Sequence, residues 1–278
     1  MPLEDYQRLI DIASTVGVYQ IALGGGNPNQ HPNFIEILEY TRFSGIVPNY
    51  TTNGRGLTTD ILKASKDCCG AVAVSAYSPF TESESAIEIL AGRGIRVNVH
   101  YILTADSISD ALELLRKPPE SFKQVNALIF LNYKPIGRSV MPEWLLSNSE
   151  KVDEFFALAT SVRHSFKIGF DSCSISGVMS YTNVHNSTVE ACDAGRFSMY
   201  ISEEMKAFPC SFYSDNGQGV TITDQSSFLQ AWQHSYDFKN ARNYFLSDQC
   251  NCNFRSRCLN GCPLFPEIRT CRPIEKSS

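Results

Sequence analysis

The first 67 residues of this 278-residue chain contain no cysteine, although the whole chain has ten. Long apolar runs are missing as well, since none reaches the ~18 residues that a membrane-spanning helix needs. The opening MPLEDYQRLIDI has none of the features of a signal peptide. These absences predict a soluble, cytoplasmic protein with no membrane partner.

The chain also lacks a basic block. Its 24 Lys and Arg against 29 Asp and Glu give a formal net charge of −5. We therefore expect no nucleic-acid partner, because nucleic-acid-binding proteins gather positive charge on one face. The 43% hydrophobic and 11% aromatic content excludes wholesale disorder and can fill the core of one large domain or two smaller ones.

What the chain does contain, in its first half, is an alternation of two kinds of segment. Apolar residues recur at helical spacing in 3–14, 33–43, 58–66, 81–92 and 107–116. Short apolar runs typical of buried strands occupy 19–23, 46–51, 71–77, 96–103 and 125–133. This alternation predicts an α/β fold with parallel strands and crossover helices, either a barrel or an open doubly wound sheet.

Beyond about residue 165 the alternation fades. KIGFDSCSIS (167–176) is a candidate last strand, and a helical signal returns around 226–246. We place a domain boundary there, which divides the chain into 1–165 and 166–278. In the first part, polar and glycine residues gather where the predicted strands end, at 24–27, 51–54, 75–78 and 132–135. Ligands bind at the carboxyl ends of parallel strands, so the set predicts a ligand site, although each stretch alone suits an ordinary turn.

The cysteines beyond residue 170 indicate metal binding. They are Cys173, Cys192, Cys210, Cys250, Cys252, Cys258, Cys262 and Cys271. Without an export signal, disulfides are the less favoured interpretation. Eight thiols make two sets of four, and four thiolates suit either a zinc ion or a [4Fe–4S] cluster. Cys68 and Cys69 precede an apolar strand and are expected to be buried thiols instead.

Several stretches resemble a known family. LGGGNPNQHPNF, IVPNYTTNG, VSAYSP, VNVHYIL and LNYKPIGR, in this order, resemble the body of a radical S-adenosylmethionine (SAM) enzyme. CDAGRF, FPCSF and CLNGCPLFPEIRTC resemble the SPASM extension of peptide maturases in that family. The resemblance covers nearly the whole chain. It implies a partial (β/α)6 barrel missing its first strand, followed by an irregular cysteine-rich SPASM-like domain.

The resemblance also implies the roles of particular residues. Gly24, Gly25 and Gly26 match the stretch that meets the methionine amino group of SAM, and Ser75 matches a ribose contact. Asn27, Asn53 and His100 would line the same pocket. Two auxiliary [4Fe–4S] clusters would be held by Cys173, Cys192, Cys210 and Cys262, and by Cys250, Cys252, Cys258 and Cys271. The implied partners are a peptide or protein substrate and an electron donor such as a flavodoxin or ferredoxin.

Three features depart from the family pattern. Asn27 stands where the family has Glu, and one residue rather than two separates Cys250 from Cys252. The C-x3-C-x2-C loop that holds the radical-generating cluster is absent, so no catalytic residue is assigned. We expect five strands rather than six, about 40 residues missing ahead of Met1 (one βα unit), and no reductive cleavage of SAM. Two alternatives stay open: a degenerate cluster- or peptide-binding protein, and an α/β protein with two structural zinc sites.

Overall fold

The computed structural model describes residues 1–137, 140–182, 189–214, 217–247 and 250–271. Its main feature is a parallel sheet whose strands follow one another in sequence order. The strands are β1 (Gln20–Leu23), β2 (Val47–Thr52), β3 (Val72–Ala76), β4 (Val97–Leu103), β5 (Ala127–Asn132) and β6 (Lys167–Phe170). Each crossover therefore joins strands that are hydrogen-bonded neighbours, as the alternation of segments predicts.

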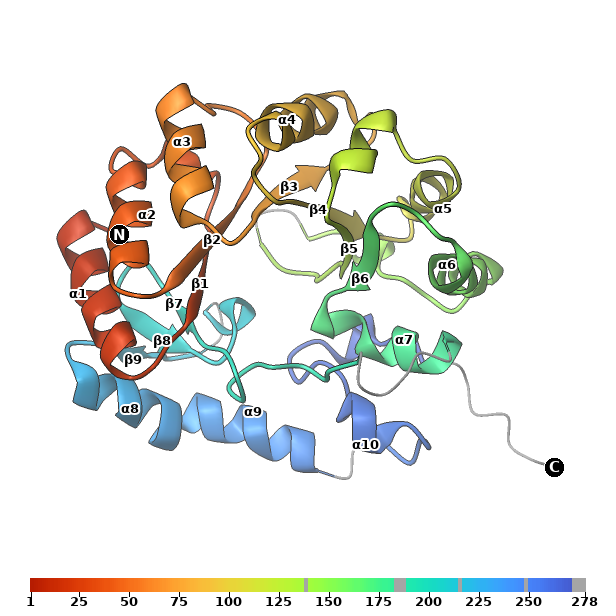
Figure 1. The fold of residues 1–278 in the computed structure, drawn as a ribbon. Coiled ribbons are helices and arrows are strands. Elements are labelled where there is room, and N and C mark those ends of the chain that lie inside the picture. Colours follow the sequence, from red (N-terminus) through yellow and green to blue (C-terminus); the bar gives the residue numbers. More distant parts are fainter. Residues whose placement is uncertain (138–139, 183–188, 215–216, 248–249, 272–278) are drawn as a thin grey trace.

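Helices cover the outer face of this curved sheet (Figure 1). They are α2 (Phe34–Phe43), α3 (Thr59–Cys68), α4 (Thr81–Gly92), α5 (Ile108–Arg116) and α6 (Glu150–Ser161), with α1 (Leu3–Thr15) beside them. Strand β4 shows why the two faces differ. Val97, Val99 and Tyr101 are buried in the core that these helices share, whereas Asn98 and His100 alternate with them and are only half-buried. The less buried face is thus the one left for polar chemistry.

The expectation of five strands is wrong, because β6 is a sixth. It pairs with β5 in parallel register, from Ala127 opposite Lys167 to Phe130 opposite Phe170. KIGF has only two large apolar residues, Ile168 and Phe170, and polar residues follow it at once, which is why it looked ambiguous in the sequence. The parallel sheet consequently extends past residue 165, where we placed the domain boundary.

The remaining elements form a smaller lobe beneath the sheet (Figure 1). Its three-stranded antiparallel sheet has the order β7 (Tyr200–Ile201), β8 (Lys206–Phe208), β9 (Val220–Thr221). The helices are α7 (Ile175–Tyr181), α8 (Gln225–His234), α9 (Tyr236–Leu246) and α10 (Arg255–Cys258). The helical signal at 226–246 proves to be two helices, because the backbone is extended at Ser235.

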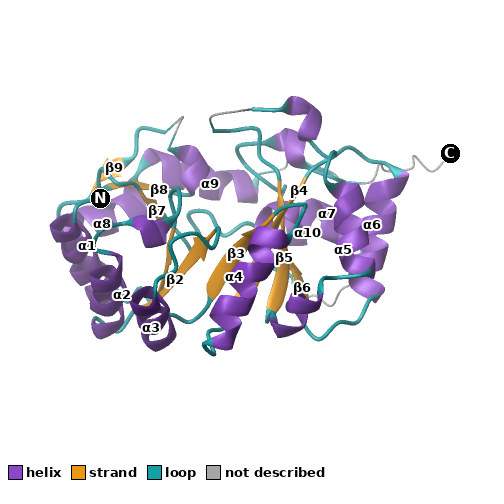
Figure 2. Cartoon of the chain, turned by 90° about the horizontal axis from the view of Figure 1, so that it is seen from above, coloured by secondary structure: helices purple, strands orange, loops and turns teal. Residues whose placement is uncertain are grey.

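Helix α1 joins this lobe to the parallel sheet. Its residues Leu9 and Ile12 are buried against Met205, Ala207 and Phe228 of the lobe. On its other face, Ile10 is buried against Ile37, which lies in α2, and against Ile46, which follows α2. The two views of Figures 1 and 2 place α1 between α2 and α8. One amphipathic helix therefore contributes to two separate apolar clusters.

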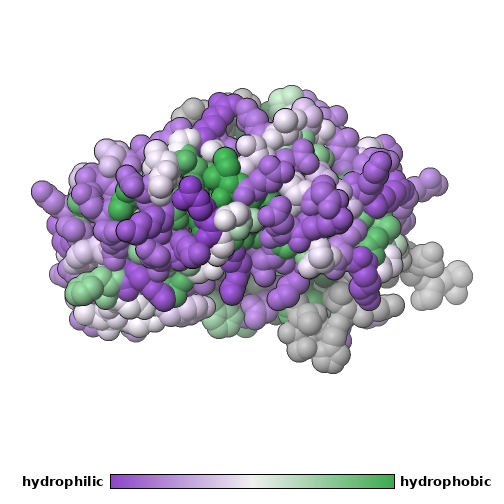
Figure 3. Space-filling view, turned by 45° about the horizontal axis from the view of Figure 1, so that its top comes forward, coloured by the Kyte–Doolittle hydropathy of each residue, from purple (hydrophilic) through white to green (hydrophobic). Residues whose placement is uncertain are grey.

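The surface is mainly hydrophilic, with apolar atoms in several separate areas of the face drawn in Figure 3. Large exposed side chains such as Phe43 and Tyr236 lie on different elements. Scattered residues of this kind are normal for proteins in water. Within the described ranges, no helix is both long enough and apolar enough to cross a bilayer.

Candidate functional site

The glycines after β1 expose backbone at the carboxyl edge of the sheet. Gly24, Gly25 and Gly26 are all exposed, and no described atom lies within 4 Å of where a Cβ would stand. Gly25 and Gly26 have φ values of +89° and +57°, which other residues rarely adopt. This stretch can therefore present its N–H and C=O groups to a ligand without side chains in the way.

The side chain of Asn27 ties this loop to the end of β2. Its Oδ1 accepts hydrogen bonds from Thr52 Oγ1 and from the N–H of Asn53, both at 3.0 Å. Its Nδ2 donates to the carbonyl of Arg55 at 3.0 Å. Asn29, which the sequence did not single out, accepts from the same Thr52 hydroxyl at 2.8 Å and donates to the same carbonyl at 2.7 Å. The structure thus brings Asn27 and Asn53 together, with Asn27 in a supporting role.

Ser75 and His100 form a second pair. They are directly opposite each other in the register of β3 and β4, and both are half-buried on the face away from the helices. Burial lowers the pKa of His100, and the charge of Asp171 only partly opposes this effect. His100 is therefore a neutral imidazole near pH 7, with one nitrogen that donates and one that accepts.

This lowered pKa predicts a pH dependence of stability. As the pH falls below about 7, the unfolded chain takes up a proton on this imidazole before the folded chain does, so the free energy of unfolding decreases. We expect His100→Gln to lose less stability than the unsubstituted chain between pH 7.5 and 5.5. Urea unfolding at several pH values measures the difference. Parallel pH profiles for the two proteins would contradict the prediction.

Four of the eight clustered thiols gather where β6 ends. Cys173 lies in the short 3-10 helix Ser172–Ser174 that follows β6, and its thiol donates a hydrogen bond to Cys262. Cys192 and Cys210 lie close enough to Cys262 for its charge to raise their pKa values further, after burial has raised them. The bond from Cys173 and the N–H groups of residues 264 and 265 lower the pKa of Cys262 to about 6. We call these four residues the first thiol set.

The other four thiols form a second thiol set: Cys250, Cys252, Cys258 and Cys271. Burial raises the pKa of Cys258 and of Cys271, and both feel the charges of Cys250 and Cys252. Cys250 and Cys252 line an open pocket of about 550 Å³. Cys258 ends α10 and is buried against Ile175 and Met179 of α7. Cys68 and Cys69 belong to neither set: they lie at the end of α3, and burial raises the pKa of Cys69 to about 12.

Backbone N–H groups point at most of these sulfur atoms. The N–H two residues later bonds the sulfur of Cys192, Cys210, Cys250, Cys252, Cys258 and Cys262. After Cys258, the left-handed residues Leu259 and Asn260 turn the chain so that this bond forms. Such bonds favour the thiolate over the thiol, which is the form that binds metal. These bonds oppose the effect of burial without cancelling it, since burial still raises the pKa of Cys192, Cys210 and Cys258 above that of a free thiol.

The donor chemistry of each thiol set suits a [4Fe–4S] cluster, and four thiolates also suit a single zinc ion. Within the described residues, no three His, Cys, Asp or Glu side chains converge as ligands of one ion would. A zinc ion needs four sulfurs about 2.3 Å from one point, whereas a [4Fe–4S] cluster takes each thiolate on a different iron. Three buried polar atoms lack hydrogen-bond partners in the described part of the chain: Asn260 Oδ1, Arg269 Nε and Thr270 Oγ1. All three lie in the sequence between Cys258 and Cys271.

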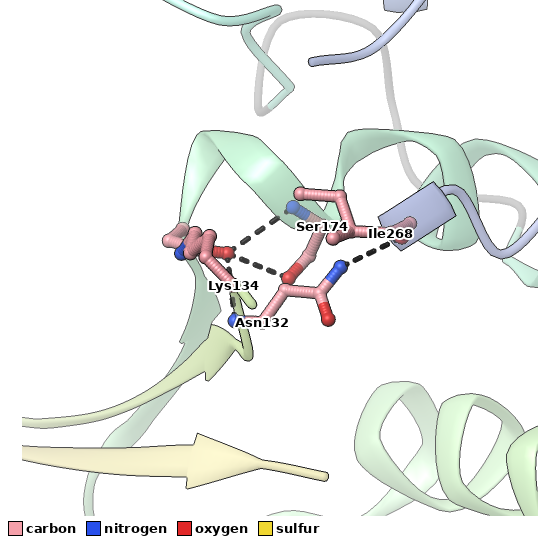
Figure 4. A network of polar contacts seen from close by, with 5 residues as sticks. Asn132, Lys134, Ser174 and Ile268 are labelled. Atoms are coloured by element: carbon pink, nitrogen blue, oxygen red, sulfur yellow. Dashed lines mark hydrogen bonds and ion pairs between the residues drawn. The ribbon is translucent and has the colours of Figure 1, made fainter. Parts of the chain in front are cut away.

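A polar network connects the sheet to the first thiol set (Figure 4). Asp171 Oδ1 accepts from Ser174 Oγ at 2.7 Å, from Ser174 N–H at 3.1 Å and from Asn132 N–H at 3.2 Å. Lys134, just after β5, forms an ion pair with the other oxygen of Asp171. The Asn132 amide donates to the carbonyl of Ile268 at 2.9 Å. Asp171 is thus the N-cap of this short helix and the ion-pair partner of a buried lysine.

Comparison with known proteins now bears on this site. No family model matches the chain. The chain is 24% identical to mycofactocin maturase MftC of Mycobacterium ulcerans (strain Agy99), over 92% of this chain and 73% of that protein. MftC of Mycobacterium tuberculosis (strain ATCC 25618 / H37Rv) is 22% identical over 91% of this chain and 68% of its own length. The chain is a relative of radical SAM peptide maturases. The family resemblance seen in the sequence is confirmed.

Solved structures of radical SAM peptide-modifying enzymes share the fold. Streptococcus suis SuiB bound to its precursor peptide SuiA has a TM-score of 0.71 and 14% identity, with 99% of this chain and 69% of that chain covered. The enzyme anSMEcpe with bound AdoMet has a TM-score of 0.66 and 15% identity, covering 97% and 82%. The α/β fold with parallel strands is therefore the radical SAM fold that the maturase relatives lead one to expect.

Proposed function

We propose that this chain is an iron–sulfur protein of the peptide-maturase type, with a partial radical SAM barrel that runs from the first residues through β6 and a SPASM-like domain in the rest of the chain. The observation that carries the proposal is the separation of eight thiols into two sets of four. Each set would hold one [4Fe–4S] cluster, which supplies one-electron transfer when bound. The thiol-only ligand sets suit such clusters, and the relationship to radical SAM peptide maturases favours clusters over zinc.

We propose further that SAM binds at the carboxyl edge of the sheet. Gly24, Gly25 and Gly26 would offer backbone groups to its methionine end, while Ser75 and His100 would reach its ribose and adenine end. Asn27 and Asn53 would shape the loop between these two groups. The exposed, left-handed glycines and the neutral imidazole support this placement, and the AdoMet-bound neighbour has the same fold.

The substrate class that we propose is a peptide or protein. The relatives are named as maturases of mycofactocin, and the SuiB structure contains a precursor peptide. We propose a small electron-transfer protein, a flavodoxin or ferredoxin, as the reductant of the clusters, and the cytoplasm as the compartment. The reducing environment there keeps clustered thiols available for metal rather than for disulfides.

These 278 residues alone should assemble clusters without cleaving SAM reductively, because no C-x3-C-x2-C sequence occurs among them. After anaerobic reconstitution with iron and sulfide, we expect about eight irons per chain, four for each thiol set. With SAM and dithionite, 5′-deoxyadenosine should stay at the level of a reaction without protein. Iron and sulfide analysis and chromatography of the products test both points. Substantial 5′-deoxyadenosine would contradict the expectation that SAM is not cleaved. Zinc in place of iron would contradict the expectation that clusters assemble.

A second candidate function is binding without turnover. The missing C-x3-C-x2-C sequence and the amide of Asn27, where the family has a carboxylate, favour it. Such a protein would still bind a peptide, with or without SAM, but would leave the peptide unchanged. Calorimetry with SAM, compared with its sulfonium-free analogue S-adenosylhomocysteine, shows whether the proposed pocket binds the cofactor at all.

A further inference from the structure

Lys134 is a buried cation beside the first thiol set. Its side chain is only 10% exposed, and that of its ion-pair partner Asp171 is 16% exposed. Its ammonium also forms a hydrogen bond with the thiol of Cys173. The charge of Lys134 also reaches two further thiols of this set, Cys210 and Cys262. One lysine therefore acts electrostatically on three of the four sulfur ligands that we assign to this set.

The surroundings hold both charges in place. Asp171 accepts three hydrogen bonds, two from Ser174 and one from Asn132, so its carboxylate has little freedom to turn away. The ammonium of Lys134 lies 5.4 Å from the centre of the Phe212 ring. Phe212 also packs with the apolar cluster around Cys262 and Phe265, which keeps water from the charges. Charges that water does not screen act more strongly on their neighbours.

The second thiol set has a cation of a different kind. The charge of Arg269 reaches two sulfur ligands of this set, Cys258 and Cys271. Its guanidinium bonds to the hydroxyl of Tyr244 and lies over that ring. A neutral phenol cannot offset the positive charge as the carboxylate of Asp171 offsets that of Lys134. The two sets are thus built with different local charge.

We propose that the Lys134–Asp171 pair sets the reduction potential of the cluster held by the first thiol set. This inference rests on the proposed function, since it requires that Cys173, Cys192, Cys210 and Cys262 bind a cluster. Reduction adds one negative charge to a cluster, which a nearby cation stabilises and a nearby carboxylate destabilises. Lys134 raises the potential and Asp171 lowers it, so the two residues act in opposite directions.

The test measures the potential of this cluster by itself. The parent is the full 278-residue chain carrying Cys271→Ser, which removes a ligand of the second set. Electron paramagnetic resonance of the reduced cluster, followed against applied potential, is recorded for Lys134→Met, Lys134→Gln, Lys134→Arg and Asp171→Asn. Two neutral replacements of the lysine are used, so that if one variant fails to bind the cluster the potential can still be measured in the other. Arg269→Gln is the matched control, because it removes a cation of the other set.

We expect both neutral replacements of Lys134 to decrease the ratio of reduced to oxidised cluster at a fixed potential about tenfold, which is about 59 mV for one electron. Asp171→Asn should increase that ratio, whereas Lys134→Arg and Arg269→Gln should leave it near the parent value. A purely structural role would move the lysine and aspartate variants together. The inference is overturned unless the neutral Lys134 variants and Asp171→Asn shift the reduction potential in opposite directions. Failure of the parent to assemble a four-iron cluster would instead overturn the proposed function.

Discussion

Replacing Cys262 by serine should remove one cluster and leave the other, so that iron per chain falls by about half. Although Cys262 lies only four residues after Cys258, its thiol bonds to Cys173 and not to its sequence neighbours. Cys271→Ser should also remove about half of the iron, but from the second set. Iron and sulfide analysis after reconstitution, with Mössbauer spectra to count cluster types, measures both effects.

Double variants reveal which thiols share a cluster. Cys262→Ser combined with Cys173→Ser should retain the same half of the iron as either single variant, because both residues belong to the first set. Cys262→Ser combined with Cys271→Ser should leave almost none. The opposite pattern would show that the sets are divided differently. Cys69→Ser is the matched control and should retain all of the iron, because Cys69 lies at the end of α3, outside both sets.

Replacing Gly177 by alanine should destabilise the folded protein and disturb the second thiol set. Gly177 lies in α7, and a Cβ there would stand 2.4 Å from Thr270 Oγ1 and 2.5 Å from Phe156 Cζ. Overpacking of this kind costs about 1–3 kcal/mol of unfolding free energy. Thr270 immediately precedes Cys271, and its N–H bonds to Ser176 at 3.2 Å. Pushing Thr270 away should therefore also weaken cluster binding by Cys271.

The matched control for this substitution is Gly92→Ala. Gly92 ends α4, and no described atom lies within 4 Å of its Cβ position. Alanine there should be neutral or stabilising by up to about 1 kcal/mol, because glycine is a poor helix former. Thermal unfolding followed by circular dichroism, with iron analysis of each variant, compares the two. Equal stability of the two variants would show that α7 and the segment around Thr270 can separate without cost.

The sequence predicted the sheet and its helices well because those segments are long enough to show their periods. The run at 96–103 alternates buried and half-buried residues over a whole strand, and the structure has β4 at Val97–Leu103. Strands β7 to β9 have only two or three residues, so no period could reveal them. These short strands depend on their partners rather than on their own pattern.

The site was predictable only in part, for a related reason. Glycines and cysteines are visible in a sequence because few other residues can replace them. The bonds from Asn27 and Asn29 to Arg55 depend on two loops that meet in space, and spacing along the chain does not reveal that meeting. The same holds for Lys134 and Asp171, which are 37 residues apart. Each follows a strand, but only the pairing of β5 with β6 brings them together.

The division of thiols has a consequence for how the protein is made. The first set needs Cys262 and the second needs Cys271, so each set takes one thiol from the ten-residue segment 262–271. A ribosome that has made the whole parallel sheet has therefore completed neither set. If the proposed ligand sets are right, both clusters can be completed only after the segment 262–271 has been made. Biogenesis should thus depend on a cluster-delivery system that acts after both lobes have been synthesised, and on protection of the thiols from oxygen in that interval.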